Sequence, residues 1–265
     1  MMCFAHHHSP LFFMTHNKPF LLAADIDGTL LGDIAGEAAI KALFEKTAGK
    51  AILALITGRS LPTIEPLIQK GRLPQPDFIC ADVGTELFDC RDPHNRLGQR
   101  FAARAAQSWD LKRIYQLGVG DGVTIQDFPD GQPRFQAGFY WDGKPDTLQA
   151  FRQRLSPLSS CLIYPSYDYY IDVLPEALGK GQAALFLQQH LGLDHARVLV
   201  AGDTGNDRQM FETGLQGVVP ANALDELKRM AVQPWHYHSP FSHAFGVLDG
   251  LRHFGLASPE EGWEM

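Results

Sequence analysis

Cysteine is scarce in this sequence. The 265 residues include 4 cysteines, and no two of them have the spacing of a metal site or a redox pair. A chain of this length buries a sizeable core without disulfide bonds. Because disulfides are rare in reducing compartments, we expect free thiols and a cytoplasmic protein.

Long apolar runs and basic clusters are also missing. A transmembrane helix needs about 20 predominantly apolar residues in succession, and the sequence has no such segment. The formal net charge is −7, and the lysines and arginines do not gather in one stretch. We therefore expect neither a membrane nor a nucleic acid as a partner.

The remaining composition is that of a soluble globular enzyme, with 45% hydrophobic and 20% charged residues. The length allows one or two domains. Residues 1–17 contain three successive histidines but lack both the positive start and the cleavage site of a signal peptide. We predict that residues 1–17 are a disordered N-terminal extension.

Two aspartates stand one residue apart at the end of an apolar segment. Residues 21–24 are typical of a buried strand, and Asp25 and Asp27 follow. In an extended chain both side chains point to the same side, at the strand end where open α/β sheets bind ligands. Two like charges this close need a cation or a shared proton. The spacing favours a metal site, and an acidic turn that only ends the strand is the alternative.

A second strand is predicted at residues 51–56, after a helix at 37–50. It ends in Thr57 and Gly58, whose hydroxyl and N–H groups are suited to phosphate oxygens, unless they form an ordinary turn. A further strand at 77–81 precedes Glu86, which either faces the ligand or lies exposed on a hairpin.

An insert interrupts this parallel pattern. We predict a helix at 101–118, strands at 123–128 and 134–141, a helix at 146–155, and strands near 160–165 and 168–174. This αββαββ unit defines an inserted domain at 102–174 and a core at 18–101 and 175–265. Its aromatic and polar residues are candidates for sugar contacts: Trp109, Tyr115, Phe139, Tyr140, Trp141, Asp142, Tyr164, Tyr167 and Tyr169.

After the insert, the chain returns to the core. Charged residues again stand at the start of a predicted helix and at the end of a predicted strand. Lys180 precedes a helix predicted at 182–191, and a lysine there would offset the charge of neighbouring carboxylates. A buried strand at 197–201 ends in Asp203, and Asp207 follows four residues later. Carboxylate oxygens are the ligands that Mg²⁺ prefers in proteins.

Together these patterns resemble the motifs of the haloacid dehalogenase (HAD) superfamily. Residues 25–30, Asp-Ile-Asp-Gly-Thr-Leu, match its DxDx[TV] signature, and Thr57, Lys180 and residues 202–207 (GDTGND) resemble its other three motifs. The insert resembles the C2-type cap of the Cof-like subclass IIB. The resemblance implies an α/β fold, a Rossmann-like parallel-sheet core with an inserted α+β cap domain.

The C-terminal segment narrows the resemblance. Residues 239–255, SPFSHAFGVLDGLRHFG, are similar to the C-terminal helix of sucrose-phosphate and mannosylfructose-phosphate phosphatases, and the resemblance spans residues 20–255. Residues 218–223 (VVPANA) are expected beside the active site. Gly28 and Leu30 stand where plant and cyanobacterial enzymes often have Asn and Trp, which weakens the case for sucrose and leaves the chemistry intact.

This resemblance also implies roles for individual residues. Asp25 is the expected nucleophile, and Asp27 is the expected general acid and then base. The phosphate oxygens would contact Thr57, Gly58, Lys180 and Asn206. Mg²⁺ is the expected cofactor, and its expected ligands are Asp25, Asp27 through its carbonyl, Asp203, and Asp207 through a water.

The sequence therefore predicts a Mg²⁺-dependent phosphatase that hydrolyses sucrose 6-phosphate or a related disaccharide phosphate through an aspartyl-phosphate. A Cof-type phosphatase acting on small hexose or cofactor phosphates is one alternative. A non-catalytic sugar-phosphate-binding partner of a glycosyltransferase is another, of a different class. For the enzyme itself, a glycosyltransferase of the same pathway stays open as a partner, and we expect a monomer or weak dimer.

Overall fold

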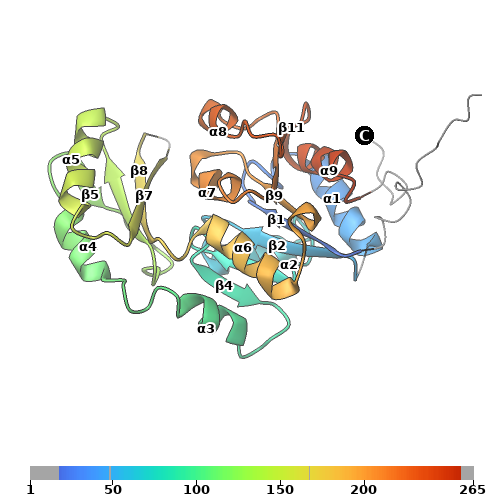
Figure 1. The fold of residues 1–265 in the computed structure, drawn as a ribbon, viewed down its shortest axis with the longest axis horizontal. Coiled ribbons are helices and arrows are strands. Elements are labelled where there is room, and N and C mark those ends of the chain that lie inside the picture. The colour runs from blue at the N-terminus through green and yellow to red at the C-terminus, as the bar shows by residue number, and fades with distance from the viewer. Residues whose placement is uncertain (1–17, 48, 167, 258–265) are drawn as a thin grey trace, which may run out of the picture.

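The computed structural model describes residues 18–257, apart from residues 48 and 167. The extension predicted at residues 1–17 lies outside the described residues. Figure 1 shows a larger α/β body and a smaller body built from residues near the middle of the chain. The two bodies correspond to two separate sheets.

The larger body is built on a seven-stranded sheet of order β11-β10-β9-β1-β2-β3-β4. All neighbouring strands run parallel except β4, which forms an antiparallel hairpin with β3. The strands are β1 (Phe20–Ala24), β2 (Ala51–Ile56), β3 (Phe78–Ala81), β4 (Glu86–Asp89), β9 (Val198–Ala201), β10 (Gln216–Val219) and β11 (His236–His238).

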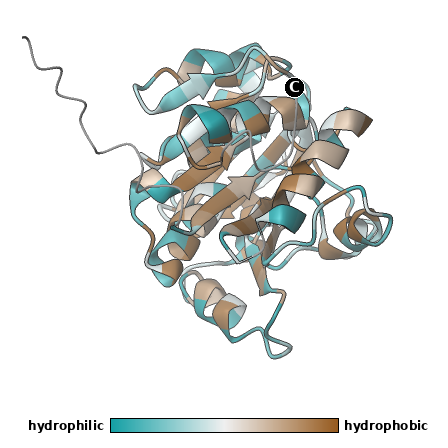
Figure 2. Ribbon diagram, turned by 90° about the vertical axis from the view of Figure 1, so that its right-hand side faces the viewer, coloured by the Kyte–Doolittle hydropathy of each residue, from teal (hydrophilic) through white to brown (hydrophobic). Residues whose placement is uncertain are grey.

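Both faces of this sheet are buried, which explains why β1 and β2 are apolar throughout. Alternate residues of β1 contribute to two separate apolar clusters. One face is covered by α1 (Ile34–Lys46), α2 (Leu61–Gln69) and α9 (His243–His253), and the other by α3 (Arg96–Ala102), α6 (Lys180–Leu191), α7 (Arg208–Phe211) and α8 (Asp225–Met230). Figure 2 shows the strongly hydrophobic strands between these amphipathic helices.

The smaller body has a four-stranded antiparallel sheet of order β5-β6-β8-β7. Its elements in chain order are α4 (Leu111–Gly118), β5 (Val123–Ile125), β6 (Ala137–Trp141), α5 (Pro145–Leu155), β7 (Cys161–Ser166) and β8 (Tyr170–Pro175). Phe139, Phe151 and Ile171 lie in its own apolar core. The predicted αββαββ order and α/β fold class are confirmed, whereas the boundaries of the insert at 102–174 stay a prediction.

Three elements of the insert are shorter than the sequence pattern predicted. The helix predicted at 101–118 is wrong in its first half, because residues 103–108 form turns and Asp110 starts α4 by accepting a hydrogen bond from the N–H of Arg113. The strands predicted at 123–128 and 134–141 are shorter in the structure, where β5 ends at residue 125 and β6 begins at residue 137. The loop between them, residues 126–136, is therefore longer than predicted. In that loop the Gln132 side chain donates to the carbonyl of Gln136, a group that a strand ladder would otherwise use.

The topology brings the chemically reactive segments to one edge of the large sheet. β1 lies between β2 and β9, and all three are parallel. Asp25 directly follows β1, Thr57 directly follows β2, and Asp203 follows β9 after one glycine. In the described part of the chain, no helix is long and apolar enough to cross a membrane.

Candidate active site

The buried ammonium group of Lys180 joins the segments at this edge. Its Nζ donates to Asp25 Oδ1 at 2.8 Å, to Asp207 Oδ1 at 2.7 Å and to Asn206 Oδ1 at 3.0 Å. Only 1% of the Lys180 side chain is exposed. A buried charge is stable only when it is paired and hydrogen-bonded, so these contacts hold the three segments together.

Lys180 itself is positioned by the loop after β3. Asp82, Val83 and Gly84 all have positive φ, of 51°, 58° and 75°. A Cβ at Gly84 would lie 2.6 Å from the backbone nitrogen of Lys180, so this loop packs directly against the start of α6. The left-handed backbone allows that close approach.

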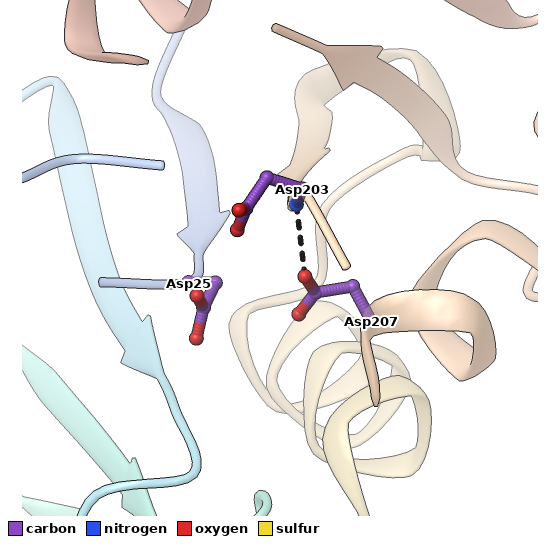
Figure 3. A group of neighbouring side chains, drawn as sticks. All are labelled: Asp25, Asp203 and Asp207. Carbon is purple, nitrogen blue, oxygen red and sulfur yellow. Dashed lines mark hydrogen bonds between the residues drawn. The ribbon is translucent and has the colours of Figure 1, made fainter. Parts of the chain in front are cut away.

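Three carboxylates meet around Lys180. Asp25, Asp203 and Asp207 each offer an oxygen, and these oxygens lie within 4.8 Å of one another. Figure 3 shows Asp25 approaching from the end of β1 and the other two from the segment after β9. Asp207 Oδ2 also accepts the backbone N–H groups of Asp203, at 2.9 Å, and of Thr204, at 3.1 Å, which ties the loop after β9 into a compact turn.

The electrostatics of this cluster favour a further cation. Burial raises the pKa of Asp25 to about 7, with Lys180 opposing the rise and Asp207 adding to it. Burial and then Asp207 raise the pKa of Asp203 to about 7. Burial alone would lower the pKa of Lys180, but Asp207 and Asp25 outweigh it and raise that pKa. The cluster holds three carboxylates and one ammonium group. Its potential metal ligands are all carboxylate oxygens, which fit a hard divalent ion such as Mg²⁺.

A turn after β1 contacts the cluster from the other side. The Thr29 hydroxyl donates to Asp203 Oδ1 at 3.0 Å, and both residues are buried. Gly28 has a φ of 76°, and a Cβ there would lie 2.2 Å from Asp203 Oδ2. The turn can approach the Asp203 carboxylate this closely only because residue 28 is glycine.

We therefore expect Gly28→Ala to reduce the catalytic activity of this candidate site by at least about 10-fold, because the new methyl group displaces the Asp203 carboxylate. The matched control is Gly214→Ala, since Gly214 has a similar φ of 79° but open space around its Cβ position. Backbone strain should lower the free energy of unfolding of both variants by about 1 kcal/mol, which thermal unfolding measures. The clash with Asp203 exists only in Gly28→Ala, and steady-state kinetics measure its effect on activity. Equal activity losses in the two variants would contradict this explanation.

Asp27 lies outside the three-carboxylate group, at the surface of the same edge. Its carboxylate is 54% exposed and forms a bidentate ion pair with Arg59, with Nε–Oδ2 and Nη2–Oδ1 distances of 2.6 Å. The Thr57 hydroxyl is buried and accepts the backbone N–H of Arg59 at 3.2 Å. A Cβ at Gly58 would lie 3.8 Å from Asn206 Nδ2, so the loop after β2 borders Asn206.

A cavity of about 320 Å³ opens beside Arg59, between the loop after β2 and the insert loop 126–136. Ser60 Oγ donates to Asp130 Oδ2 across it at 3.0 Å. Gln126 Oε1 is buried at its wall, without a hydrogen-bond partner among the described residues. A second cavity of about 350 Å³, between β7 and α7 to α8, has no contact with Arg59. The first cavity is therefore the better candidate for a bound substrate.

Gln136, which lines this cavity, is bound to a second polar residue of the insert. The side-chain amide of Gln136 donates to Asp172 Oδ1 at 2.7 Å. Burial raises the pKa of Asp172 to about 6, while Gln136 and Lys180 oppose the rise. A wall of amides and carboxyl groups is suited to hydroxyl-rich ligands.

Several residues at the site were not singled out from the sequence. Arg59, Thr29, Asn222 and His243 appear in the quoted motifs, but nothing in the pattern revealed their partners. Among the aromatic candidates, Phe139 and Trp141 are buried in the core of the insert rather than facing the cavity, and Tyr167 lies outside the described residues. The position of Arg59, three residues after the end of β2, which neighbours β1, was the available signal.

Comparisons with known proteins concern the fold and the family of this chain. The fold matches a subclass IIB sugar phosphatase of the HAD superfamily, with a TM-score of 0.62 over 90% of this chain and 100% of that chain at 18% identity. The class of protein, a phosphatase of the HAD superfamily, is shown by the matching family model and by relatives of higher sequence identity. The chain belongs to the sucrose-6F-phosphate phosphohydrolase family, whose sequence model matches residues 18–255.

Two relatives are similar over nearly their whole length. The mannosylfructose-phosphate phosphatase of Agrobacterium fabrum is 33% identical over 254 residues, which cover 90% of this chain and 98% of that protein. The crystal structure of the sucrose-phosphatase from Synechocystis sp., in complex with sucrose and phosphate, has a TM-score of 0.78 at 29% identity, over 90% of this chain and 98% of that chain. The predicted superfamily and enzyme class are thereby confirmed.

Proposed function

We propose that this protein is a Mg²⁺-dependent phosphatase that hydrolyses a disaccharide phosphate such as sucrose 6-phosphate. The observation that carries the proposal is the buried contact of Lys180 with Asp25, beside Asp203 and Asp207. One carboxylate is held at the strand end by a cation, with further oxygen ligands next to it. This is what an aspartate needs to attack the phosphorus of a phosphate monoester.

In the first step an Asp25 carboxylate oxygen forms the bond to phosphorus, and the bond from phosphorus to the sugar oxygen breaks. To act as the acid, Asp27 at the mouth of the site first opens its ion pair with Arg59 and takes up a proton from solvent, which it then transfers to the leaving oxygen. In the second step Asp27 takes a proton from water, the water oxygen bonds to phosphorus, and Asp25 is released with inorganic phosphate. Lys180, Asn206, Thr57 and the N–H groups near Gly58 hold the phosphate oxygens in line.

The metal-binding residues in this proposal are Asp25, Asp203, the backbone carbonyl of Asp27, and Asp207 through a water. When bound, Mg²⁺ would neutralise charge on the phosphate and on Asp25. The net negative charge of the carboxylate cluster supports this assignment, since Lys180 balances only part of it.

The choice of a disaccharide phosphate depends on the cavity and on the relatives. The cavity beside Arg59 is lined by polar residues from the loop after β2 and from the insert loop 126–136. Such a lining suits a sugar leaving group that is rich in hydroxyls. Relatives named for mannosylfructose phosphate and sucrose support the same class. The cytoplasmic location, the glycosyltransferase partner and the monomer or weak dimer stay predictions.

The test is phosphate release from a panel of esters with and without Mg²⁺. We expect kcat/KM for sucrose 6-phosphate or mannosylfructose phosphate to exceed that for glucose 6-phosphate at least about 10-fold, because the second sugar ring adds binding energy in the cavity. Excess EDTA should abolish turnover, and added Mg²⁺ should restore it. A preference for small hexose or cofactor phosphates would support the Cof-type alternative. Absence of turnover on every ester would contradict the proposal.

A further inference from the structure

The backbone carbonyl of Gly28 is bound from two distant segments. It accepts a hydrogen bond from Asn222 Nδ2 at 2.7 Å and one from the ring Nδ1 of His243 at 3.1 Å. Since a carbonyl oxygen only accepts, the proton of the neutral His243 ring lies on Nδ1. Gly28 is the residue next to Asp27, so both contacts act on the turn that carries that carboxylate.

The two donors are also bound to each other. Asn222 Oδ1 accepts the backbone N–H of His243 at 2.7 Å. His243 has a φ of 53°, a left-handed conformation that is unusual for a residue with a side chain. Such backbone strain persists only where the surroundings impose it. Here the strained residue starts α9 and directs its ring toward the turn.

Asn222 belongs to a segment that is anchored to the carboxylate cluster. Two residues later, the Leu224 N–H donates to the backbone carbonyl of Asp203 at 2.8 Å. The Ala221 N–H donates to the backbone carbonyl of Phe241 at 2.8 Å, which connects the same segment to the residues just before α9. The turn after β1 is therefore held in a fixed relation to the segment after β9.

The far end of the turn is fixed as well. The Gly32 N–H donates to Glu37 Oε1 at 3.3 Å, and Glu37 is paired with Arg72. A Cβ at Gly32 would lie 2.5 Å from the His243 ring, so the ring fills the space between Gly28 and Gly32. The turn is thus supported along its length by groups outside it.

We propose that Asn222 and His243 are positioning residues that hold the Asp27 carboxylate at the mouth of the site through the carbonyl oxygen of Gly28. Arg59 contacts the Asp27 side chain, whereas Asn222 and His243 fix its backbone. The inference rests on the proposed function, in which Asp27 protonates the leaving group. A misplaced Asp27 matters most when the leaving oxygen is a strong base.

The experiment compares kcat/KM for a sugar phosphate and for p-nitrophenyl phosphate, because kcat/KM reports the steps up to departure of the leaving group. The variants are Asn222→Ala, Asn222→Asp and His243→Gly. Asn222→Asp keeps the acceptor for the His243 N–H but places an oxygen against the Gly28 carbonyl. His243→Gly removes the ring while still permitting a positive φ. The control is Tyr237→Phe, which removes a hydrogen bond to Asp249 in the same C-terminal region.

We expect both Asn222 variants to lose about 100-fold in kcat/KM on the sugar phosphate and less than about 5-fold on p-nitrophenyl phosphate, whose leaving group departs without a proton. His243→Gly, which removes the longer bond, should show a smaller loss with the same selectivity. Tyr237→Phe should leave both values within about 2-fold while losing comparable thermal stability.

Equal losses on the two esters, or no loss on either, would overturn the inference while leaving the proposed function intact. Wild-type protein that hydrolyses neither ester would overturn the proposed function and the inference together. If Asn222→Ala does not fold, the comparison of His243→Gly with Tyr237→Phe decides the question by the same criterion.

Discussion

Replacement of Asp25 by Asn is expected to abolish phosphate release, with a fall in kcat of about 10⁴-fold or more. An amide oxygen is a far weaker nucleophile than a carboxylate oxygen, and within residues 18–257, apart from 48 and 167, Asp25 is the one carboxylate that directly follows β1. The amide has the same shape, and its oxygen still accepts the hydrogen bond that Lys180 donates to Asp25 Oδ1. The fold and the binding of a sugar phosphate should therefore remain.

Three measurements check this expectation. Phosphate release gives the loss in kcat, calorimetric titration with the sugar phosphate gives binding, and circular dichroism gives folding. Asp33→Asn is the matched control, because Asp33 caps α1 through its side chain and an asparagine retains that cap. Unchanged turnover in Asp25→Asn would end the assignment of Asp25 as nucleophile.

Replacement of Lys180 by Met should have the second large effect, on stability and on activity at once. The variant keeps most of the side-chain volume but leaves the Asp25 and Asp207 carboxylates buried without their cation. Removing one partner of a buried pair costs about 3–5 kcal/mol in the free energy of unfolding. Loss of the positive charge beside the reacting phosphate should also reduce kcat about 10²–10³-fold.

Urea denaturation and steady-state kinetics measure the two losses. Lys144→Met is the control, since Lys144 pairs with Asp142 at an exposed site and the change should cost less than about 1 kcal/mol. Adding Asp207→Asn to Lys180→Met should recover part of the lost stability, because one of the uncompensated charges is removed. A Lys180→Met protein as stable as wild type would show that Lys180 does not neutralise this cluster.

The core of the fold follows from local patterns. Residues 51–56 form a strand as predicted, because a continuous apolar run bounded by polar residues suits a strand covered on both faces. The αββαββ order of the insert was also readable from its alternating periods. The first half of the helix predicted at 101–118 was not, since the Asp110 cap gives α4 its start and leaves residues 103–108 as turns.

The candidate site divides in the same way. Asp25, Asp203 and Asp207 meet because parallel strands end at a common edge, and strand assignments alone anticipate that meeting. The ion pair of Arg59 with Asp27 and the contacts of Asn222 and His243 with Gly28 depend on how loops cross in space. No periodicity or spacing encodes such contacts, so only the tertiary structure reveals them.

The insert loop 126–136 has a consequence for how this enzyme family diversifies. Its shape depends on contacts of individual side chains such as Gln132, with few main-chain ladder bonds, whereas Asp25 and Lys180 sit in rigid, enclosed surroundings. If the cavity beside Arg59 receives the sugar, as we propose, mutations in the loop would remodel that surface at little cost to the reaction chemistry. Substrate preference could then change one residue at a time while the hydrolytic residues stay the same.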